Sequence, residues 1–242
     1  MTRQVLLNNI DHAELKVMPR FGTEHGDAVN QLPVFPTEFE ALQREFPILF
    51  RRDEEGALQA VVLLGLDRSE NLFLGSDGWL SRSVPAIQRR GPFSISVAQR
   101  GDDPDAAREP MIHVDLDDPR VGGSEGHRLF LPHGGNSPYL AEIVEVLRTI
   151  YEGLEASGPM YAAWEALGLV QPVAIEIAVE EGRSYNLPDY QAVSAEALAS
   201  LGGTALDSLH RAGFLAPAIF ALSSLGNVPH LIERKNRKDA QR

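Results

Sequence analysis

The chain has 242 residues, a net charge of −12 and no cysteine. A chain of this length buries roughly 70% of the surface that its unfolded form exposes, so we expect it to fold without disulfides or a structural metal. The missing cysteines exclude thiolate nucleophiles, cysteine-ligated zinc and iron–sulfur clusters. The acidic charge disfavours nucleic-acid binding, because the protein would repel the phosphate backbone.

The N-terminal segment lacks the pattern of a secretion signal. Its apolar run extends only over Val5, Leu6 and Leu7 and is followed at once by Asn8. A signal peptide needs a longer apolar run and a small-residue cleavage site. No stretch of the sequence approaches the ~18 apolar residues of a membrane-spanning helix. We therefore expect a soluble, cytoplasmic protein without a membrane span.

The first half is predicted to be rich in strands. Thr37 has the position of an N-cap, with Glu40 completing a capping box, and Pro47 ends the short helix that follows. The uninterrupted apolar run at 60–66 is typical of a strand covered on both faces, and residues 71–74 are predicted as its hairpin partner. Further strands are predicted at 48–50, 93–97 and 111–114, with a short helix at 83–91 and an acidic loop at 101–109.

The second half is predicted to be mainly helical. Ser137 and Pro138 are residue types that start helices, and apolar residues recur at helical spacing up to Leu154. Gly158 and Pro159 are expected to break this helix. A hairpin is predicted from 173–179 to 184–187 across a turn at 180–183, and helices are predicted at 161–167, 194–201, 204–211, 214–225 and from 228 onward.

These elements predict an α+β fold. The N-terminal half is strand-rich, with an antiparallel or mixed sheet, and the C-terminal half is helix-rich with one β-hairpin. Residues 234–242 carry five basic side chains and are predicted to form a frayed, solvated helix end. The alternative is that this basic tail docks to an acidic partner or a membrane surface.

A series of short motifs runs along most of the chain. It includes Leu64-Gly65-Leu66, Glu70-Asn71-Leu72-Phe73-Leu74, Val84-Pro85-Ala86, Glu125-Gly126-His127-Arg128-Leu129-Phe130 and Leu209-His210-Arg211-Ala212-Gly213. In this order, over about residues 30–235, the motifs resemble the SapC family of bacterial proteins. The resemblance implies one SapC-like domain over residues 1–242. It also implies a link to bacterial surface-layer proteins, for which the family is named, and it supplies no catalytic residues.

One pair of residues suggests metal chemistry. His113 and Asp115 form an HxD pair, which provides two ligands of the facial triad in non-haem iron oxygenases. Residues two apart on a strand point to the same side, and His210 or His230 would be the third ligand. The alternative is an edge-strand histidine that leads into the acidic turn at 115–119. That turn has carboxylates suited to calcium but not the EF-hand spacing, and a solvated turn is its alternative.

Two other classes of chemistry find no support in the sequence. There is no GxGxxG and no Walker lysine, so a phosphate cradle is not expected. There is also no GxSxG nucleophile elbow. His127 and His133 flank a loop and could act as bases, but no nucleophile lies near them in the sequence.

The segment from Asn71 to Phe93 is the best candidate for a binding surface. Aromatic and arginine side chains together are typical of interface hot spots. The alternative is that the aromatic residues are core residues and the arginines end a helix. The candidate residues are Asn71, Phe73, Trp79, Arg89, Arg90 and Phe93.

The sequence therefore favours a non-enzymatic accessory protein that binds another protein and uses no cofactor. The first alternative is a 2-oxoglutarate-type iron oxygenase that uses the HxD pair. The second alternative is a structural role in surface-layer export or assembly.

Overall fold

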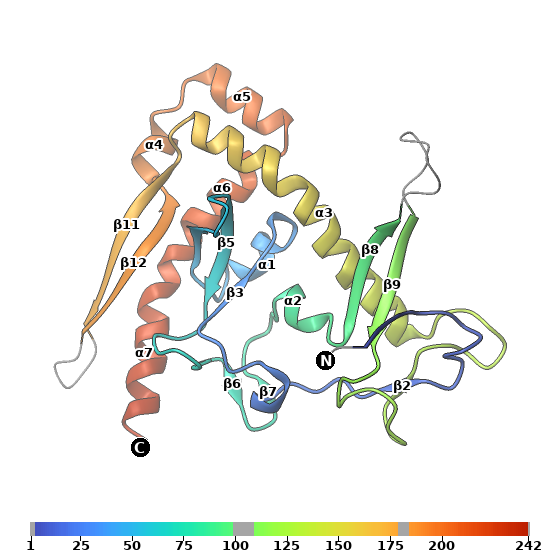
Figure 1. The fold of residues 1–242 in the computed structure, drawn as a ribbon. Helices are drawn as coiled ribbons and strands as arrows, with labels where there is room; N and C mark the ends of the chain where they lie inside the picture. Colours follow the sequence, from blue (N-terminus) through green and yellow to red (C-terminus); the bar gives the residue numbers. More distant parts are fainter. Residues whose placement is uncertain (1–2, 99–108, 179–183, 242) are drawn as a thin grey trace. The chain divides into compact units, whose positions relative to one another are not determined.

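The computed structural model describes residues 3–98, 109–178 and 184–241 (Figure 1). Contacts between Cα atoms group the chain into two compact units. The first unit consists of residues 1–21 and 86–151, and the second unit consists of residues 22–85 and 152–242. The prediction of one domain over the whole chain stays a prediction. The turn expected at 180–183 lies outside the described residues, as does the acidic loop expected at 101–109, apart from Glu109.

The first unit is a three-stranded antiparallel sheet packed on the first half of a long helix. The strand order is β1-β9-β8. Val5 lies opposite Val114, and Phe93 lies opposite Val114 on the other side, so these apolar side chains share one face of the sheet. This face packs against Leu140 and Ile143 of α3 in the buried core. The elements are β1 (Gln4–Leu6), β2 (Lys16–Val17), α2 (Ala86–Arg89), β8 (Phe93–Ala98), β9 (Glu109–Asp115), β10 (His127–Arg128) and α3 (Pro138–Ala166), which continues into the second unit.

The second unit contains a five-stranded antiparallel sheet in the order β11-β12-β4-β5-β3, with helices packed against it. The strands are β3 (Gln31–Pro33), β4 (Ile48–Arg52), β5 (Leu58–Leu63), β11 (Val170–Ala178) and β12 (Ser184–Val193), beside the small pair β6 (Leu74–Gly75) and β7 (Gly78–Trp79). The helices are η1 (Thr23–His25), η2 (Pro36–Glu38), α1 (Phe39–Leu42), α4 (Ala195–Ala199), α5 (Gly203–Arg211), α6 (Leu215–Ser224), η4 (Leu225–Asn227) and α7 (Val228–Asp239).

Phe50 of β4 anchors one face of this sheet to helices. Its ring meets Trp164 of α3 edge-on, with centroids 5.8 Å apart, and it makes similar contacts with Tyr161 of α3 and Phe39 of α1. Arg52, two residues on, points to the same side and pairs with Glu165 of α3 at 2.5 Å. The intervening residue, Arg51, therefore lies on the opposite face of the sheet.

Helix α6 is fixed to the start of β4 by polar contacts from its C-terminal end. Ser224 is fully buried, and its Oγ accepts a hydrogen bond from the Ile48 amide at 2.8 Å. The Asn227 side-chain amide donates to the carbonyls of Gln43 and Phe46. These bonds satisfy backbone groups that would otherwise be buried without partners.

The α+β fold class is confirmed, with strands concentrated in the first half and helices in the second. The capping box expected at Thr37 and Glu40 is wrong, because Thr37 lies inside η2 and Glu38 bonds to the Phe35 amide. Two larger features, a hairpin and a helix break, are also wrong. Residues 71–74 do not form a hairpin with the strand before them, because β5 pairs with β3 and β4. The Asn71 side chain instead bonds to the Asp27 carbonyl and the Phe73 amide.

The second of these features is the helix break at Gly158 and Pro159. α3 runs unbroken for 29 residues from Pro138 to Ala166 and contains Pro159. A proline inside a helix removes one backbone hydrogen bond and clashes with the preceding turn. The residues after it, Met160, Tyr161 and Trp164, are all buried, and this packing outweighs the local cost.

Gly153 in α3 provides a test of this packing. A Cβ atom at Gly153 would lie 2.4 Å from Phe35 Cβ and 2.7 Å from Thr37 Oγ1, whereas one at Gly158 would meet nothing within 4 Å. We expect Gly153→Ala to lower the free energy of unfolding by roughly 1–3 kcal/mol through overpacking. Gly158→Ala is the matched control and should raise it by about 0.5–1 kcal/mol, because alanine is the better helix former. Urea unfolding of both variants measures the difference, and equal effects would contradict the packing.

Candidate functional site

Ionisable groups cluster where α7 meets the loop after β5. Lys235 is fully buried, and its Nζ lies 2.5 Å from Asp67 Oδ2, 3.0 Å from Glu70 Oε1 and 3.4 Å from Asp239 Oδ1. Lys238 adds a second cation, with its Nζ 3.2 Å from the same Glu70 oxygen. We call these five residues the α7 clamp.

The loop is shaped to present the two acids. The second carboxylate oxygen of Glu70 accepts hydrogen bonds from the amides of Leu66 and Asp67 at 3.2 and 3.3 Å. Gly65 is required at the start of the loop, because a Cβ atom there would lie 2.3 Å from the Glu70 carbonyl oxygen. From β12, Tyr185 donates its hydroxyl proton to Asp67 Oδ2 at 3.2 Å.

The charges in the α7 clamp hold one another ionised. The hydrogen bond from Lys235 lowers the pKa of Asp67 despite some burial. For Glu70, burial pushes the pKa up, but hydrogen bonds from Lys235, Leu66 and Lys238 outweigh it and the net shift is downward. Burial likewise opposes the charge on Lys235, yet the two carboxylates raise its pKa.

Three carboxylates surround the Lys235 ammonium group and favour its protonated form over the free amine that a nucleophile or a Schiff base needs. Within the second unit, the α7 clamp attaches α7 to the loop after β5. On α7, Lys235 lies four residues after buried Leu231, a spacing that places both on the same face of the helix. This spacing is the one signal in the sequence that points to a buried lysine.

The prediction that residues 234–242 form a frayed, solvated helix end is wrong over the range that α7 covers. Helix α7 continues through Asp239, and Lys235 is buried. Arg234 lies over the Phe73 ring at 4.4 Å from the centroid. The tail is ordered over this range because its cations find acids and an aromatic face within the second unit.

The run from α6 through α7, Leu215–Asp239, is long and apolar enough to cross a membrane by length and composition alone. Among the described residues it is the one such run, and 22% of its most apolar window is buried. Helix α6 is bonded to β4 and α7 is held by the α7 clamp. The absence of a membrane span stays a prediction.

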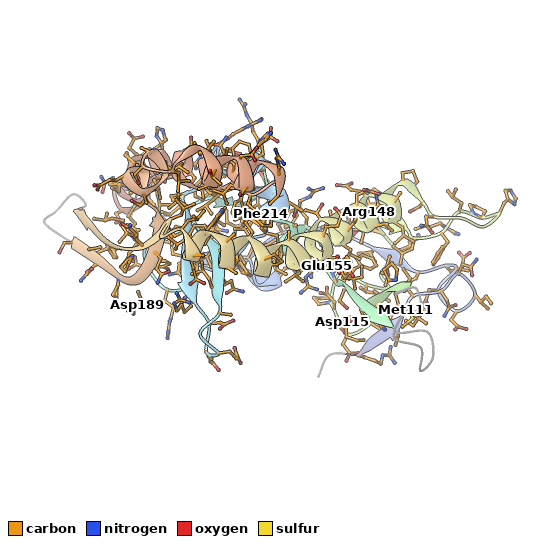
Figure 2. All side chains as sticks on the ribbon, turned by 90° about the horizontal axis from the view of Figure 1, so that it is seen from above. Met111, Asp115, Arg148, Glu155, Asp189 and Phe214 are labelled. Carbon is orange, nitrogen blue, oxygen red and sulfur yellow. The ribbon has the colours of Figure 1, made fainter. Side chains whose placement is uncertain are left out.

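The first unit contains an open groove of about 430 Å³. It lies where β1 ends and β9 begins; Figure 2 shows Met111 and Asp115 on β9. Its lining is mainly apolar and includes three asparagines. The lining residues are Leu6, Leu7, Asn8, Asn9, Pro110, Met111, Ile112, Phe130, Gly135, Asn136 and Leu140. We call it the β1 groove.

The six residues predicted to form one binding surface fall in both units. In the second unit, Asn71 and Phe73 are buried, and Trp79 donates its indole N–H to Asp27 at 3.3 Å. Asn71 also bonds to the Asp27 carbonyl, so these residues hold the chain's own 22–27 segment and α7. Their contacts are intramolecular.

The other three predicted residues lie in the first unit. Phe93 is fully buried in the core. Arg90 donates to the Phe93 carbonyl at 2.6 Å, and burial together with the nearby Arg120 lowers its pKa. Arg89 pairs with Glu142 at 3.3 Å.

The HxD pair lies on β9. Asp115 is buried, and its Oδ1 accepts the amides of Arg3 at 2.9 Å and Asp117 at 3.1 Å. His113 Nδ1 lies 3.4 Å from Ser96 Oγ. The proposed third ligands, His210 and His230, belong to the second unit. Among the described residues, no group of three histidine, aspartate or glutamate side chains is arranged to hold a metal.

The remaining candidates have structural contacts. In the acidic turn, Asp118 accepts two hydrogen bonds from the Arg120 guanidinium, and Asp117 lies 3.8 Å from Arg3. The ring of His127 stacks on Tyr139 with centroids 5.2 Å apart. Burial raises the pKa of Tyr139 to about 12, so this hydroxyl stays protonated at neutral pH.

The geometry thus defines a two-unit α+β protein with an open groove in one unit and an ionic clamp in the other. The SapC family profile matches residues 7–231 of the chain. The protein belongs to the SapC family. No curated protein and no solved structure shows a significant match.

Replacement of Lys235 tests the α7 clamp directly. In Lys235→Met, the buried Glu70 carboxylate loses its main cation, so we expect the free energy of unfolding to fall by about 3–5 kcal/mol. Arg237→Met is the control, because this exposed arginine lies on the same helix and should change stability by less than about 0.5 kcal/mol. Urea unfolding of both variants measures this, and a Lys235→Met protein as stable as the control would contradict the clamp.

The same cluster predicts a pH dependence. Asp67 and Glu70 have pKa values lowered from 3.8 and 4.5, so their contribution is complete above the unfolded values and is lost as pH falls through the folded values. Lys235, with a raised pKa, contributes fully below 10.5 and loses its contribution only as pH rises through its folded value. We expect the wild type to lose more stability than Lys235→Met between about pH 5 and pH 3. Urea unfolding at each pH measures this, and an equal fall in the free energy of unfolding for both proteins would contradict the prediction.

Proposed function

We propose that this SapC-family protein is a non-enzymatic accessory protein that binds an extended segment of another protein in the β1 groove. The observation that carries the proposal is the combination of a mainly apolar groove with an edge of β1 that pairs with no other described strand; Leu6 of β1 lines the groove. A partner segment needs apolar pockets for its side chains and hydrogen-bonding groups for its backbone.

The strand edge is supplied by β1. Within the described residues it is the outer strand of its sheet. The Leu7 amide donates to the Ile112 carbonyl and the Arg3 carbonyl accepts from Leu116, so these alternate residues face β9. In an antiparallel pair the residues between them point the other way. The backbone groups of Gln4 and Leu6 are therefore directed to the open edge, where an extended peptide can add as a further strand.

One exposed large apolar side chain of the first unit lines the groove, and two others are neighbours of lining residues in the sequence. In this unit, the exposed large apolar side chains among the described residues are Leu6, Ile10 and Leu131, at 46%, 84% and 48% exposure. Leu6 lines the groove, and the other two adjoin the lining residues Asn9 and Phe130 in sequence. Clustered exposed apolar groups rimmed by polar ones are typical of protein-binding sites.

Selection of peptides tests the proposal. We expect a displayed library of random peptides, selected on the full-length protein, to yield extended sequences with apolar residues at alternate positions, matching the period of a strand. Leu6→Glu and Met111→Glu should each weaken the selected peptide at least tenfold, because a buried charge without a partner is costly. Leu154→Glu is the matched control, because Leu154 is 57% exposed but belongs to the second unit. The selected peptide should bind this variant as tightly as the wild type.

Two results would overturn the proposal. One is a selection that enriches no peptide. The other is a selected peptide that binds the two groove variants as tightly as the wild type. The peptide can be methylated on either of two sets of alternate backbone amides. Methylation of the set that faces β1 should abolish binding, and methylation of the other set should leave it unchanged, because strand addition uses every second amide.

A further inference from the structure

In the second unit, the face of the five-stranded sheet opposite Phe50 carries a polar pocket of about 280 Å³. It is separate from the β1 groove, which belongs to the first unit. Its size is just below the range of about 300–1,000 Å³ that is usual for small-molecule sites. The lining residues are Gln31, Pro33, Arg51, Arg52, Asp53, Glu54, Gln59 and Val61.

Arg51 is the central charged group of this pocket. The neighbouring Arg52 points to the helix-covered face and bonds to Glu165 and the Gly56 carbonyl. Arg51 points to the other face, is half-buried, and within the described part of the chain its guanidinium has no hydrogen-bond or ion-pair partner. A half-buried guanidinium with free donors is suited to bind a carboxylate in a bidentate manner.

Two amide side chains flank the guanidinium. Gln59 lies directly opposite Arg51 in the β4–β5 register. The Tyr190 hydroxyl donates to Gln31 Oε1 at 2.6 Å, and this bond fixes the Gln31 amide with its NH₂ group available as a donor. The Gln31 NH₂ group can therefore donate to a ligand. The pocket thus presents donors from three strands, β3, β4 and β5.

Negatively charged side chains lie at one end of the same pocket. Asp53 and Glu54 begin the turn between β4 and β5. The Asp53 carboxylate caps this turn by accepting the Ala57 amide at 2.7 Å, which fixes the acidic end in place. The floor between the two ends is formed by Pro33 and Val61. A simple anion would be repelled by the turn, whereas a ligand with both a carboxylate and an ammonium group matches both ends.

We propose that this pocket binds a free α-amino acid. The ligand carboxylate lies against Arg51 and Gln59, its ammonium group faces the Asp53–Glu54 turn, and its side chain lies on Val61 and Pro33. The site is a binding site without chemistry, and it is independent of peptide binding in the β1 groove.

Calorimetric titration of the full-length protein with each of the common L-amino acids tests the site. Titration to ~10 mM reveals even millimolar dissociation constants. We expect at least one amino acid to bind, and Arg51→Gln to weaken it at least tenfold, the usual effect of losing a charge-assisted pair. Arg44→Gln is the matched control, since Arg44 is an exposed arginine on the same unit that pairs with Glu40, and it should bind like the wild type.

A second variant tests whether the pocket recognises the ammonium group of the amino acid. Glu54→Gln should weaken the amino acid but leave its deaminated analogue, which has the carboxylate alone, unchanged. Glu54 is an exposed turn residue, so this variant retains the fold even if Arg51→Gln does not. The proposal is overturned if no amino acid binds the wild type, if Arg51→Gln binds as tightly, or if the deaminated acid binds as well as the amino acid.

Discussion

Burial of the Lys235 ammonium group is the constraint on which the second unit depends. An ammonium taken out of water costs several kcal/mol, and only acids placed within hydrogen-bonding distance offset this. Asp67 and Glu70 occupy those positions because the loop after β5 folds back on the Glu70 carboxylate. Helix α7, the loop and Tyr185 of β12 therefore specify one another's positions. Helix α7 is therefore part of the fold of the second unit.

The sequence predicted those elements whose pattern is local. The apolar runs of β5 and β8 and the Ser137–Pro138 start of α3 were found, because alternation and capping are visible within a few residues. The passage of α3 through Pro159 could not be found, since it depends on burial of Tyr161 and Trp164 against β4. Lys235 was missed for the same reason: its partner acids are 165 and 168 residues away in the chain.

The candidate sites show a similar limit. Both are built from segments that are distant in sequence: β1, β9 and the start of α3 for the β1 groove, and three strands for the Arg51 pocket. In each site, neighbouring residues of one strand point to opposite faces of the sheet, one into the core and the next into the site. Val5 faces the core while Leu6 faces the groove, and Phe50 faces α3 while Arg51 faces the pocket. A register shift of one residue would exchange these roles, so the core that fixes the register also fixes the site.

The order of strands in the second sheet has a consequence for synthesis on the ribosome. β4 pairs with β5 on one side, its immediate successor in the chain, but on the other side with β12, where Phe50 meets Gln191. The whole second segment of the first unit is translated between these two strands. Until β12 emerges, the edge of β4 has no strand to pair with, and an unpaired edge is a template for aggregation. The longer the interval between synthesis of β4 and synthesis of β12, the longer this edge of β4 stays exposed on the nascent chain.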